Sequence, residues 1–267
     1  MKKTIGILLA GLSLVVCALF LNAQTATKES QFICPPCSGD CDKAIHDKPG
    51  QCPTCGMALI SKESVKNVAI FLYDGVEILD FGGPSEVFAA SHSDKGAFRV
   101  FTVAATKEPI LSQGFVRIVP EFSIEDCPEP DIIVLPGGNT TPSVENAKVV
   151  EWVKKHAAHV DALMSVCTGA FILEKAGLLV GKKATTFHRA IPRLREKAKQ
   201  TEVLENVRWV DNGQIVTTAG VSAGIDGALH IVERMWGLEA AAATAQYMEY
   251  DKWKPEDGVV VEKKNDK

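Results

Sequence analysis

Residues 162–177 read Ala-Leu-Met-Ser-Val-Cys-Thr-Gly-Ala-Phe-Ile-Leu-Glu-Lys-Ala-Gly, and the pattern changes at Cys167 from an apolar strand to a helix. Such a turn holds the side chain at its apex clear of the sheet, and the first N–H groups of the helix lower the pKa of a thiol there. The sequence therefore predicts that Cys167 is a nucleophile. The alternative is a small buried core cysteine. The small neighbours Ser165, Thr168 and Gly169 leave room at the turn and favour the reactive thiol.

Apolar strands and helical patterns alternate through the rest of the main domain. This rhythm predicts an α/β fold with a mostly parallel sheet. The expected strands are 68–73, 98–104, 132–135 and 163–166, and the expected helices are 84–91, 144–156, 168–176 and 222–236. Residues 207–210 and 215–218 flank Asp211-Asn-Gly213, which is typical of a hairpin.

Two further segments follow strands and are expected at the same edge of the sheet as Cys167. Asp80 lies in the stretch after the first strand, and Gly137 and Gly138 end the strand 132–135. Ligands of open α/β sheets bind outside the carboxyl ends of the strands. We therefore expect the Asp80 carboxyl group near the thiol, and an oxyanion site formed by the N–H groups of Gly137, Gly138 and Thr168.

Four ordered motifs in this chain resemble the ThiJ/PfpI superfamily. They are Pro-Gly-Gly at 136–138, Ser-Val-Cys-Thr-Gly-Ala at 165–170, Ala-Thr-Thr-Phe-His at 184–188 and Thr-Ala-Gly-Val-Ser-Ala-Gly-Ile-Asp at 218–226. The resemblance implies a flavodoxin-like sandwich over residues 67–253, with Cys167 as nucleophile and Asp80 as its carboxyl partner. Leu-Asp-Phe-Gly-Gly-Pro-Ser-Glu-Val-Phe at 79–88 and the Cys-Thr pair are most similar to isonitrile hydratases and to sensor domains of AraC-type regulators. Thr168 stands where the protease and deglycase branches carry histidine.

The resemblance implies a reaction that needs no cofactor. Asp80 in a dry pocket has a raised pKa and can donate a proton. Attack of Cys167 on an isonitrile carbon, with protonation of the nitrogen by Asp80, gives a thioimidate that water converts to a formamide. Thr168 positions that water, and His188 either lines the pocket and moves protons or is structural. The alternatives are a non-catalytic small-molecule or redox sensor and a glyoxalase or deglycase-type enzyme.

Residues 32–62 predict a small metal-binding knuckle module, similar to a zinc ribbon, ahead of this domain. The pairs Cys34 and Cys37, and Cys52 and Cys55, are first-choice ligands, and Cys41 and His46 are alternative ones. Four thiolates suit a structural zinc ion, and copper is the second candidate. The segment resembles the short heavy-metal-binding domain of copper-efflux proteins. A disulfide-stapled knob is the alternative.

The two ends and the composition define the setting of the protein. Residues 1–23 begin with Lys2 and Lys3 and continue as an apolar run, which predicts a cleaved signal peptide, an exported (periplasmic or secreted) protein and no stable membrane span after cleavage. A retained anchor is the alternative. The 267 residues carry a net charge of −4 and no basic module, so we expect no nucleic-acid partner. We expect a small-molecule substrate, a homodimer, and a charged, solvated tail over 254–267.

Overall fold

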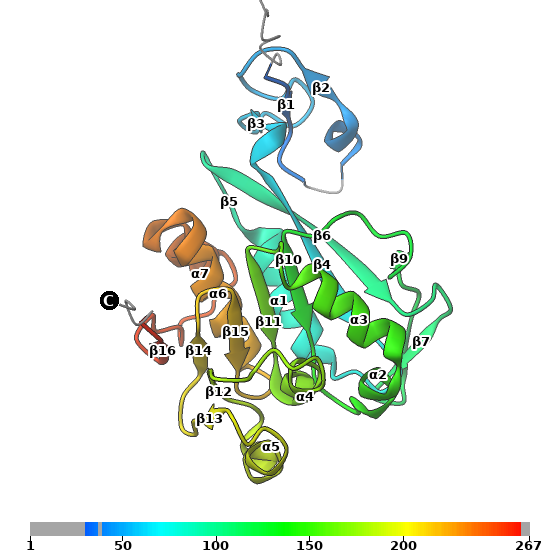
Figure 1. Ribbon diagram of the computed structural model, residues 1–267. Coiled ribbons are helices and arrows are strands. Elements are labelled where there is room, and N and C mark those ends of the chain that lie inside the picture. Colours follow the sequence, from blue (N-terminus) through cyan, green and yellow to red (C-terminus); the bar gives the residue numbers. More distant parts are fainter. Residues whose placement is uncertain (1–29, 37–38, 263–267) are drawn as a thin grey trace, which may run out of the picture.

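The computed structural model describes residues 30–36 and 39–262, in which a nine-stranded sheet forms the centre of the main domain (Figure 1). Five neighbouring strands of this sheet run parallel, in the order β15, β11, β10, β4, β6. They are β4 (Val65–Leu72), β6 (Gly96–Ala104), β10 (Ile132–Leu135), β11 (Ala162–Ser165) and β15 (Ile215–Thr218). The predicted α/β fold with a mostly parallel sheet is confirmed.

Short strands complete both edges of the sheet. The predicted hairpin is present, because β14 (Trp209–Asp211) pairs antiparallel with β15. Beyond it lies β16 (Gly258–Val260), which runs parallel to β14. This strand belongs to the segment that the sequence predicts as a solvated tail, and it differs from that prediction because the open edge of β14 supplies hydrogen-bonding partners for its backbone. At the other edge, β5 (His92–Ser93) and β9 (Phe122–Ser123) both pair with β6.

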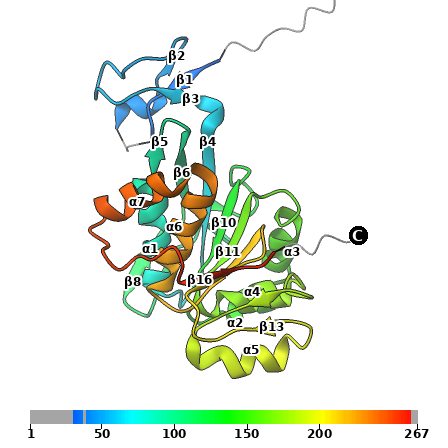
Figure 2. The same cartoon turned by 90° about the vertical axis from the view of Figure 1, so that its left-hand side faces the viewer.

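Helices cover both faces of the sheet, as Figure 2 shows. One layer consists of α1 (Ile78–Ala90), α6 (Ala223–Trp236) and α7 (Leu238–Tyr247). The other consists of α2 (Thr141–Glu145), α3 (Ala147–His156) and α4 (Ala170–Lys175), with α5 (Ile191–Lys197) at the end of the domain. Burial on both faces explains the continuous apolar runs of the strands, since residues 68–72 are at most 1% exposed.

Two helices differ from the sequence prediction in ways that matter for the site. Helix α1 begins at Ile78 and carries Pro84 in its interior, whereas a proline usually marks a helix start because it cannot donate a backbone hydrogen bond. The expected helix over 144–156 is interrupted at Asn146, whose side chain accepts hydrogen bonds from the N–H groups of Lys148 (3.0 Å) and Val149 (3.4 Å). Asn146 therefore starts a second helix.

The N-terminal module is a three-stranded sheet at the amino end of β4 (Figure 1). Its strands are β1 (Phe32–Ile33), β2 (Ile45–His46) and β3 (Ile60–Ser61). Ile33 and Ile60 pack on Ala97 of β6, and a short 3-10 turn over Lys62–Ser64 leads directly into β4. The remaining short strands are β7 (Ile110–Ser112), β8 (Val116–Ile118), β12 (Lys183–Ala184) and β13 (Glu202–Val203).

Several sequence predictions fall on residues that are not described. They concern the signal segment 1–23, the ligand Cys37 and residues 263–267 of the tail. Within residues 30–36 and 39–262, no helix is both long enough and apolar enough to cross a bilayer.

Candidate functional site

Cys167 lies at a strained elbow between β11 and α4. Its φ angle is +56°, a left-handed conformation that residues other than glycine rarely adopt. Three hydrogen bonds hold the backbone in this conformation: the Val166 N–H donates to Leu135 O (3.0 Å), the Cys167 N–H to Ala219 O (3.0 Å), and the Thr186 hydroxyl to Cys167 O (2.6 Å). The elbow predicted from the sequence is present, and its geometry is fixed by neighbours from three other segments.

Asp80 lies beside this thiol, in the first turn of α1, and is completely buried. Its Oδ2 accepts a hydrogen bond from the Gly137 N–H (2.9 Å). Its Oδ1 has no partner of ordinary hydrogen-bond geometry among the described residues, although the Cys167 thiol and the Val221 N–H are near enough to affect its charge. The pKa of Asp80 is raised to about 7, mainly by burial; the hydrogen bond from the Gly137 N–H opposes this increase, and the charge of Glu77 contributes to it. This carboxyl group can both accept and donate a proton near neutral pH.

The thiol itself differs from the sequence expectation of a depressed pKa. The pKa of Cys167 is raised to about 12, mainly by burial and in smaller part by the negative charge of Asp80. The N–H and hydroxyl groups of Thr168 oppose it without reversing it. The helix-terminus argument fails here because Cys167 is only 6% exposed and faces a carboxylate. The resting thiol is therefore protonated, and any reaction in which it acts as a nucleophile requires a base.

Gly137 and Gly138 lie where the sequence places them, but their amides are already used. The Gly137 N–H donates to Asp80, and the Gly138 N–H donates to Thr168 Oγ1 (2.9 Å), whose hydroxyl in turn donates to Gly138 O (2.9 Å). The amide that remains directed at the sulfur is that of Thr168. An oxyanion role for Gly137 and Gly138 stays a prediction that requires these hydrogen bonds to be exchanged.

Gly137 is needed at its position for steric reasons. A Cβ atom there would lie 2.7 Å from Asp80 Oδ2, from Cys167 Cβ and from Thr168 N. Distances this short do not occur between such atoms, so the thiol and the carboxyl group are brought together only because residue 137 has no side chain.

His188 lies apart from the thiol. Its ring stacks edge-on against Phe187, with ring centroids 4.4 Å apart. It lines a depression of about 440 Å³ together with Thr186 and Arg208, and neither Cys167 nor Asp80 is among the lining residues of this depression. The described contacts give the imidazole no direct bond to Cys167 or Asp80, and the link between the two regions is the hydrogen bond from the Thr186 hydroxyl to Cys167 O.

Two residues near the thiol, Tyr73 and Val221, are not predicted as site residues from the sequence. The hydroxyl of Tyr73 lies 2.8 Å from Pro136 O and 2.7 Å from Gly137 O, beneath the glycine that contacts Asp80. Burial, Asp80 and Cys167 all raise the pKa of this phenol. Val221 has φ +54°, which is an outlier for a β-branched residue, and its N–H is directed at Asp80. Membership of the motif at 218–226 could have indicated Val221. The position of Tyr73 depends on how two strands pack, which the sequence pattern does not show.

A second cluster of reactive groups lies in the N-terminal module. The sulfur atoms of Cys34, Cys41, Cys52 and Cys55 are all within 4.8 Å of one another. The sulfur atoms of Cys34 and Cys55 are 3.3 Å apart, and those of Cys34 and Cys41 are 3.8 Å apart. Tetrahedral zinc with four sulfur ligands requires separations of about 3.8 Å, so the four thiols fit such an ion with small adjustments.

The cluster includes one residue that the sequence predicts only as an alternative ligand. Cys41, predicted only as an alternative ligand, takes part in the cluster, while Cys37 lies outside the described residues. His46 is not in the cluster. Hydrogen bonds from the N–H groups of Cys55 and Thr54 lower the pKa of Cys52 to about 6, whereas burial raises that of Cys34. Metal binding requires thiolates, and backbone N–H groups at a cysteine knuckle favour them.

The fold and the site together define a class of proteins: a parallel α/β sandwich in which a cysteine at a strand-to-helix elbow lies against a buried carboxyl group. Comparison with known protein families identifies this class. The profile of the DJ-1/PfpI family matches residues 66–234. The chain belongs to the DJ-1/PfpI family.

Three similar proteins show the range of this family. The chain is 32% identical over 187 residues to an isonitrile hydratase of Pseudomonas putida, covering 68% of this chain and 78% of that protein. It is 25% identical to the transcriptional regulator CdhR of Pseudomonas aeruginosa, over 61% of this chain and 48% of the regulator. A crystal structure of a ThiJ/PfpI family protein from Pseudomonas syringae superposes with a TM-score of 0.64 at 27% identity, covering 71% of this chain and 77% of that one.

Proposed function

We propose that the Cys167 site hydrates a small isonitrile to an N-substituted formamide. The observation that carries this proposal is the contact between a protonated thiol and a buried carboxyl group with a pKa of about 7. The similarity to an isonitrile hydratase supports it. The reaction needs a nucleophile together with one group that takes and returns protons, and these two residues supply both.

In the first step, the Asp80 carboxylate accepts the thiol proton while Cys167 Sγ bonds to the terminal carbon of the isonitrile, R–N≡C. Return of this proton to the same carbon gives the thioimidate R–N=CH–S–Cys167. Because burial keeps the thiol protonated until substrate arrives, the carboxylate at its side is the base.

In the second step, water adds to the thioimidate carbon and its proton passes through Asp80 to the nitrogen. The tetrahedral adduct then breaks its C–S bond, which releases R–NH–CHO and restores the thiol. We assign orientation of the water to Thr168, because its hydroxyl donates to Gly138 O and accepts from Gly138 N and so keeps one lone pair for a further donor. The Thr168 N–H, with Gly137 and Gly138 after rearrangement, is assigned to the substrate nitrogen, and His188 to the outer pocket.

Formamide production from alkyl and aryl isonitriles, followed by chromatography, tests this function. Wild type and Cys127→Ala, whose thiol lies outside the site, are expected to turn over substrate at equal rates. Cys167→Ala and Asp80→Asn are expected to lose activity at least about 100-fold. Equal activity in Cys167→Ala would contradict a covalent mechanism.

A sensor role is the second candidate function. The nearly complete burial of Cys167 and the similarity to CdhR favour it. The two candidates separate experimentally, since a sensor binds isonitrile-sized or oxidising molecules without releasing formamide. Turnover of 2-oxoaldehydes, tested alongside, covers the glyoxalase or deglycase-type alternative.

We also propose a structural zinc ion bound by Cys34, Cys41, Cys52 and Cys55, with Cu(I) as the alternative. Elemental analysis of the full chain purified without added metal is expected to find one zinc per chain. Cys41→Ser is expected to lower the metal content, and Cys127→Ser serves as the matched control. Metal content that is unchanged in Cys41→Ser would point to a ligand outside this set.

Two further properties, export and self-association, are proposed from the sequence. We propose that residues 1–23 direct the chain out of the cytoplasm and are removed, and that the mature protein forms a homodimer. Mass spectrometry of the protein from its native host is expected to show a chain beginning at Gln24, and light scattering is expected to give twice the mass of one chain.

A further inference from the structure

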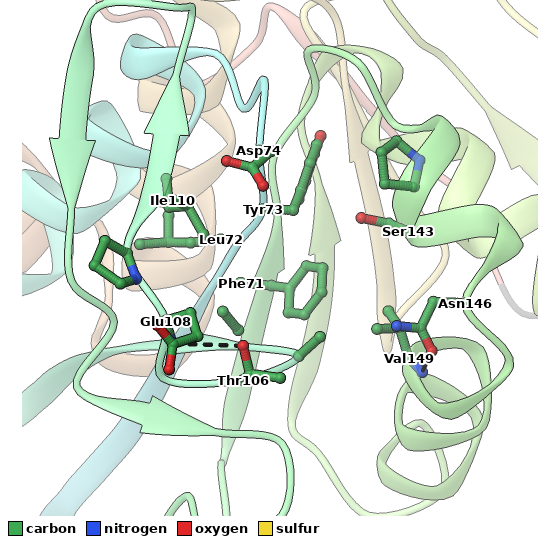
Figure 3. Close-up of a pocket in the computed structure, with 14 residues that line it drawn as sticks. Phe71, Leu72, Tyr73, Asp74, Thr106, Glu108, Ile110, Ser143, Asn146 and Val149 are labelled. Atoms are coloured by element: carbon green, nitrogen blue, oxygen red, sulfur yellow. Dashed lines mark hydrogen bonds between the residues drawn. The ribbon is translucent and has the colours of Figure 1, made fainter.

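A second cavity lies at the carboxyl ends of β4 and β6, on the face covered by α2 and α3 (Figure 3). Its volume is about 210 Å³, equivalent to about seven water molecules. The chain continues from β4 to β6 on one side of β4 and later to β10 on the other. The cavity therefore lies beside the position where the strand order reverses, which is where open α/β sheets bind ligands.

One polar group in the wall of this cavity has no hydrogen-bond partner among the described residues. Ser143 is 2% exposed, and its hydroxyl makes no hydrogen bond with any described residue. Figure 3 shows this hydroxyl directed from α2 toward Tyr73 and Phe71. Buried hydroxyl groups are nearly always hydrogen-bonded, so this oxygen indicates an occupant that carries a polar group.

The rest of the lining is apolar and aromatic at the centre and acidic at the entrance. Phe71, Tyr73, Ile110 and Val149 supply the apolar wall, and the exposed carboxylates of Asp74 and Glu108 lie at the rim. No lysine, arginine or histidine is among the lining residues.

Two basic residues adjoin lining residues in the sequence, and both are paired with carboxylates outside the lining. Lys107 forms an ion pair with Asp126, and Lys148 pairs with Glu125 at 2.9 Å. The charged residues that line the cavity are therefore two carboxylates, Asp74 and Glu108. Its aromatic rings also attract cations and not anions.

We propose that this cavity binds a small primary alkylammonium ion, at a site separate from the Cys167 chemistry. The ammonium group donates to the Ser143 hydroxyl and lies near the face of Tyr73, in the field of Asp74 and Glu108. The alkyl group packs against Phe71, Ile110 and Val149. The hydroxyl of Tyr73 is occupied by the carbonyls of Pro136 and Gly137, so its ring is left to form the cavity wall.

Three probes that share one alkyl group test the charge preference directly. They are tert-butylammonium, tert-butanol and pivalate, titrated into the full-length protein while the methyl NMR signals of Ile110 and Val149 are followed. The signals of Ile33 in the N-terminal module serve as an internal control. Saturable shifts at the two cavity methyl groups are expected with the cation, with affinity at least about tenfold weaker for the alcohol and no binding of the anion. Equal affinity for alcohol and cation, or no saturable shift with the cation, would overturn the proposal.

Matched variants locate the cation within the cavity. Ser143→Ala is expected to weaken tert-butylammonium binding about two- to tenfold. The double variant Asp74→Asn/Glu108→Gln is expected to weaken it about three- to tenfold. The double variant Glu86→Gln/Glu239→Gln changes the net charge equally on exposed helix surfaces of the opposite layer and is expected to bind as wild type. Wild-type affinity in both cavity variants would show that the cation binds elsewhere.

Discussion

The charge of Asp80 adds to the burial that raises the pKa of Cys167, whereas the thiol of Cys167 lowers the pKa of Asp80, which burial and the charge of Glu77 raise. With Asp80 near 7 and the thiol near 12, the first proton lost as pH rises belongs to the carboxyl group. The resting site at neutral pH thus holds a thiol beside a partly ionised carboxyl group. This order of ionisation is suited to a base that is regenerated in every cycle.

The first prediction concerns the pH dependence of turnover. Because Asp80 must be ionised to accept the thiol proton, kcat/KM for isonitrile hydration is expected to fall about tenfold per pH unit below about pH 7. Initial rates between pH 5 and 9 measure this profile. A rate that stays constant down to pH 5 would be incompatible with Asp80 as the base.

The second prediction is that Asp80→Asn changes the alkylation rate of the Cys167 thiol and the turnover of substrate in opposite directions. Asp80→Asn removes the charge that raises the thiol pKa, so alkylation of Cys167 by iodoacetamide at pH 9 is expected to become severalfold faster. Turnover is expected to be lost in the same variant. Labelling of Cys127, quantified in the same digest, provides the control. Slower alkylation in the variant would show that the carboxylate promotes thiolate formation.

The third prediction concerns stability. The pKa of Asp80 rises on folding from 3.8 to about 7, so the folded state holds its proton more tightly than the unfolded state. The contribution of Asp80 to the free energy of unfolding is therefore fully present below about pH 4 and is lost as the pH rises through about 7. Asp80→Asn is expected to unfold several degrees above wild type at pH 8, with a smaller difference at pH 5, as measured by calorimetry. If the unfolding temperatures of the variant and wild type differed equally at pH 5 and pH 8, ionisation of Asp80 would not be the cause of the difference.

At the scale of elements, the candidate active site depends on a close approach of the loop after β10 to the elbow after β11. Gly137→Ala places a methyl group into the space between Asp80, Cys167 and Thr168. It is expected to destabilise the protein by about 1–3 kcal/mol and to abolish turnover. Gly82→Ala, in the interior of α1 with no atom within 4 Å of the new Cβ, is expected to stabilise by up to about 1 kcal/mol. Chemical denaturation of both variants provides the measurement.

The elements also show how far the sequence determines this fold. The buried strands follow from their apolar runs, and the elbow from the abrupt change of pattern at Cys167. Helix α1 is less predictable, because Pro84 imitates a helix start while burial of Val87 and Phe88 holds the helix together around it. The raised thiol pKa and the hydrogen bonds of Tyr73 depend on burial and on contacts between distant strands. Sequence spacing carries no information about either.

At the scale of the whole molecule, the cysteine cluster and the thiol site lie at opposite ends of the parallel strands. The module joins the amino end of β4, whereas Cys167 and Asp80 follow the carboxyl ends of β11 and β4 (Figure 1). The only described apolar cluster shared by the module and the sheet is small, formed by Ile33, Ile60 and Ala97 with Val65. The two sites are therefore expected to behave independently.

Removal of the proposed metal ion from the cysteine cluster tests whether the two sites are independent. A module whose core is mainly a cysteine cluster cannot bury enough apolar surface to fold alone, so metal binding and folding are coupled. Chelation of the full-length protein is expected to abolish hydrogen-exchange protection of β1 to β3. The protection of β10 and β11, and isonitrile turnover, are expected to remain within about twofold of the untreated protein, because the core of the main domain contains none of the four cysteines. Cys52→Ser should reproduce the effect of chelation without a chelator. A parallel loss of protection in β10 and β11 would show instead that the module supports the folded state of the whole domain.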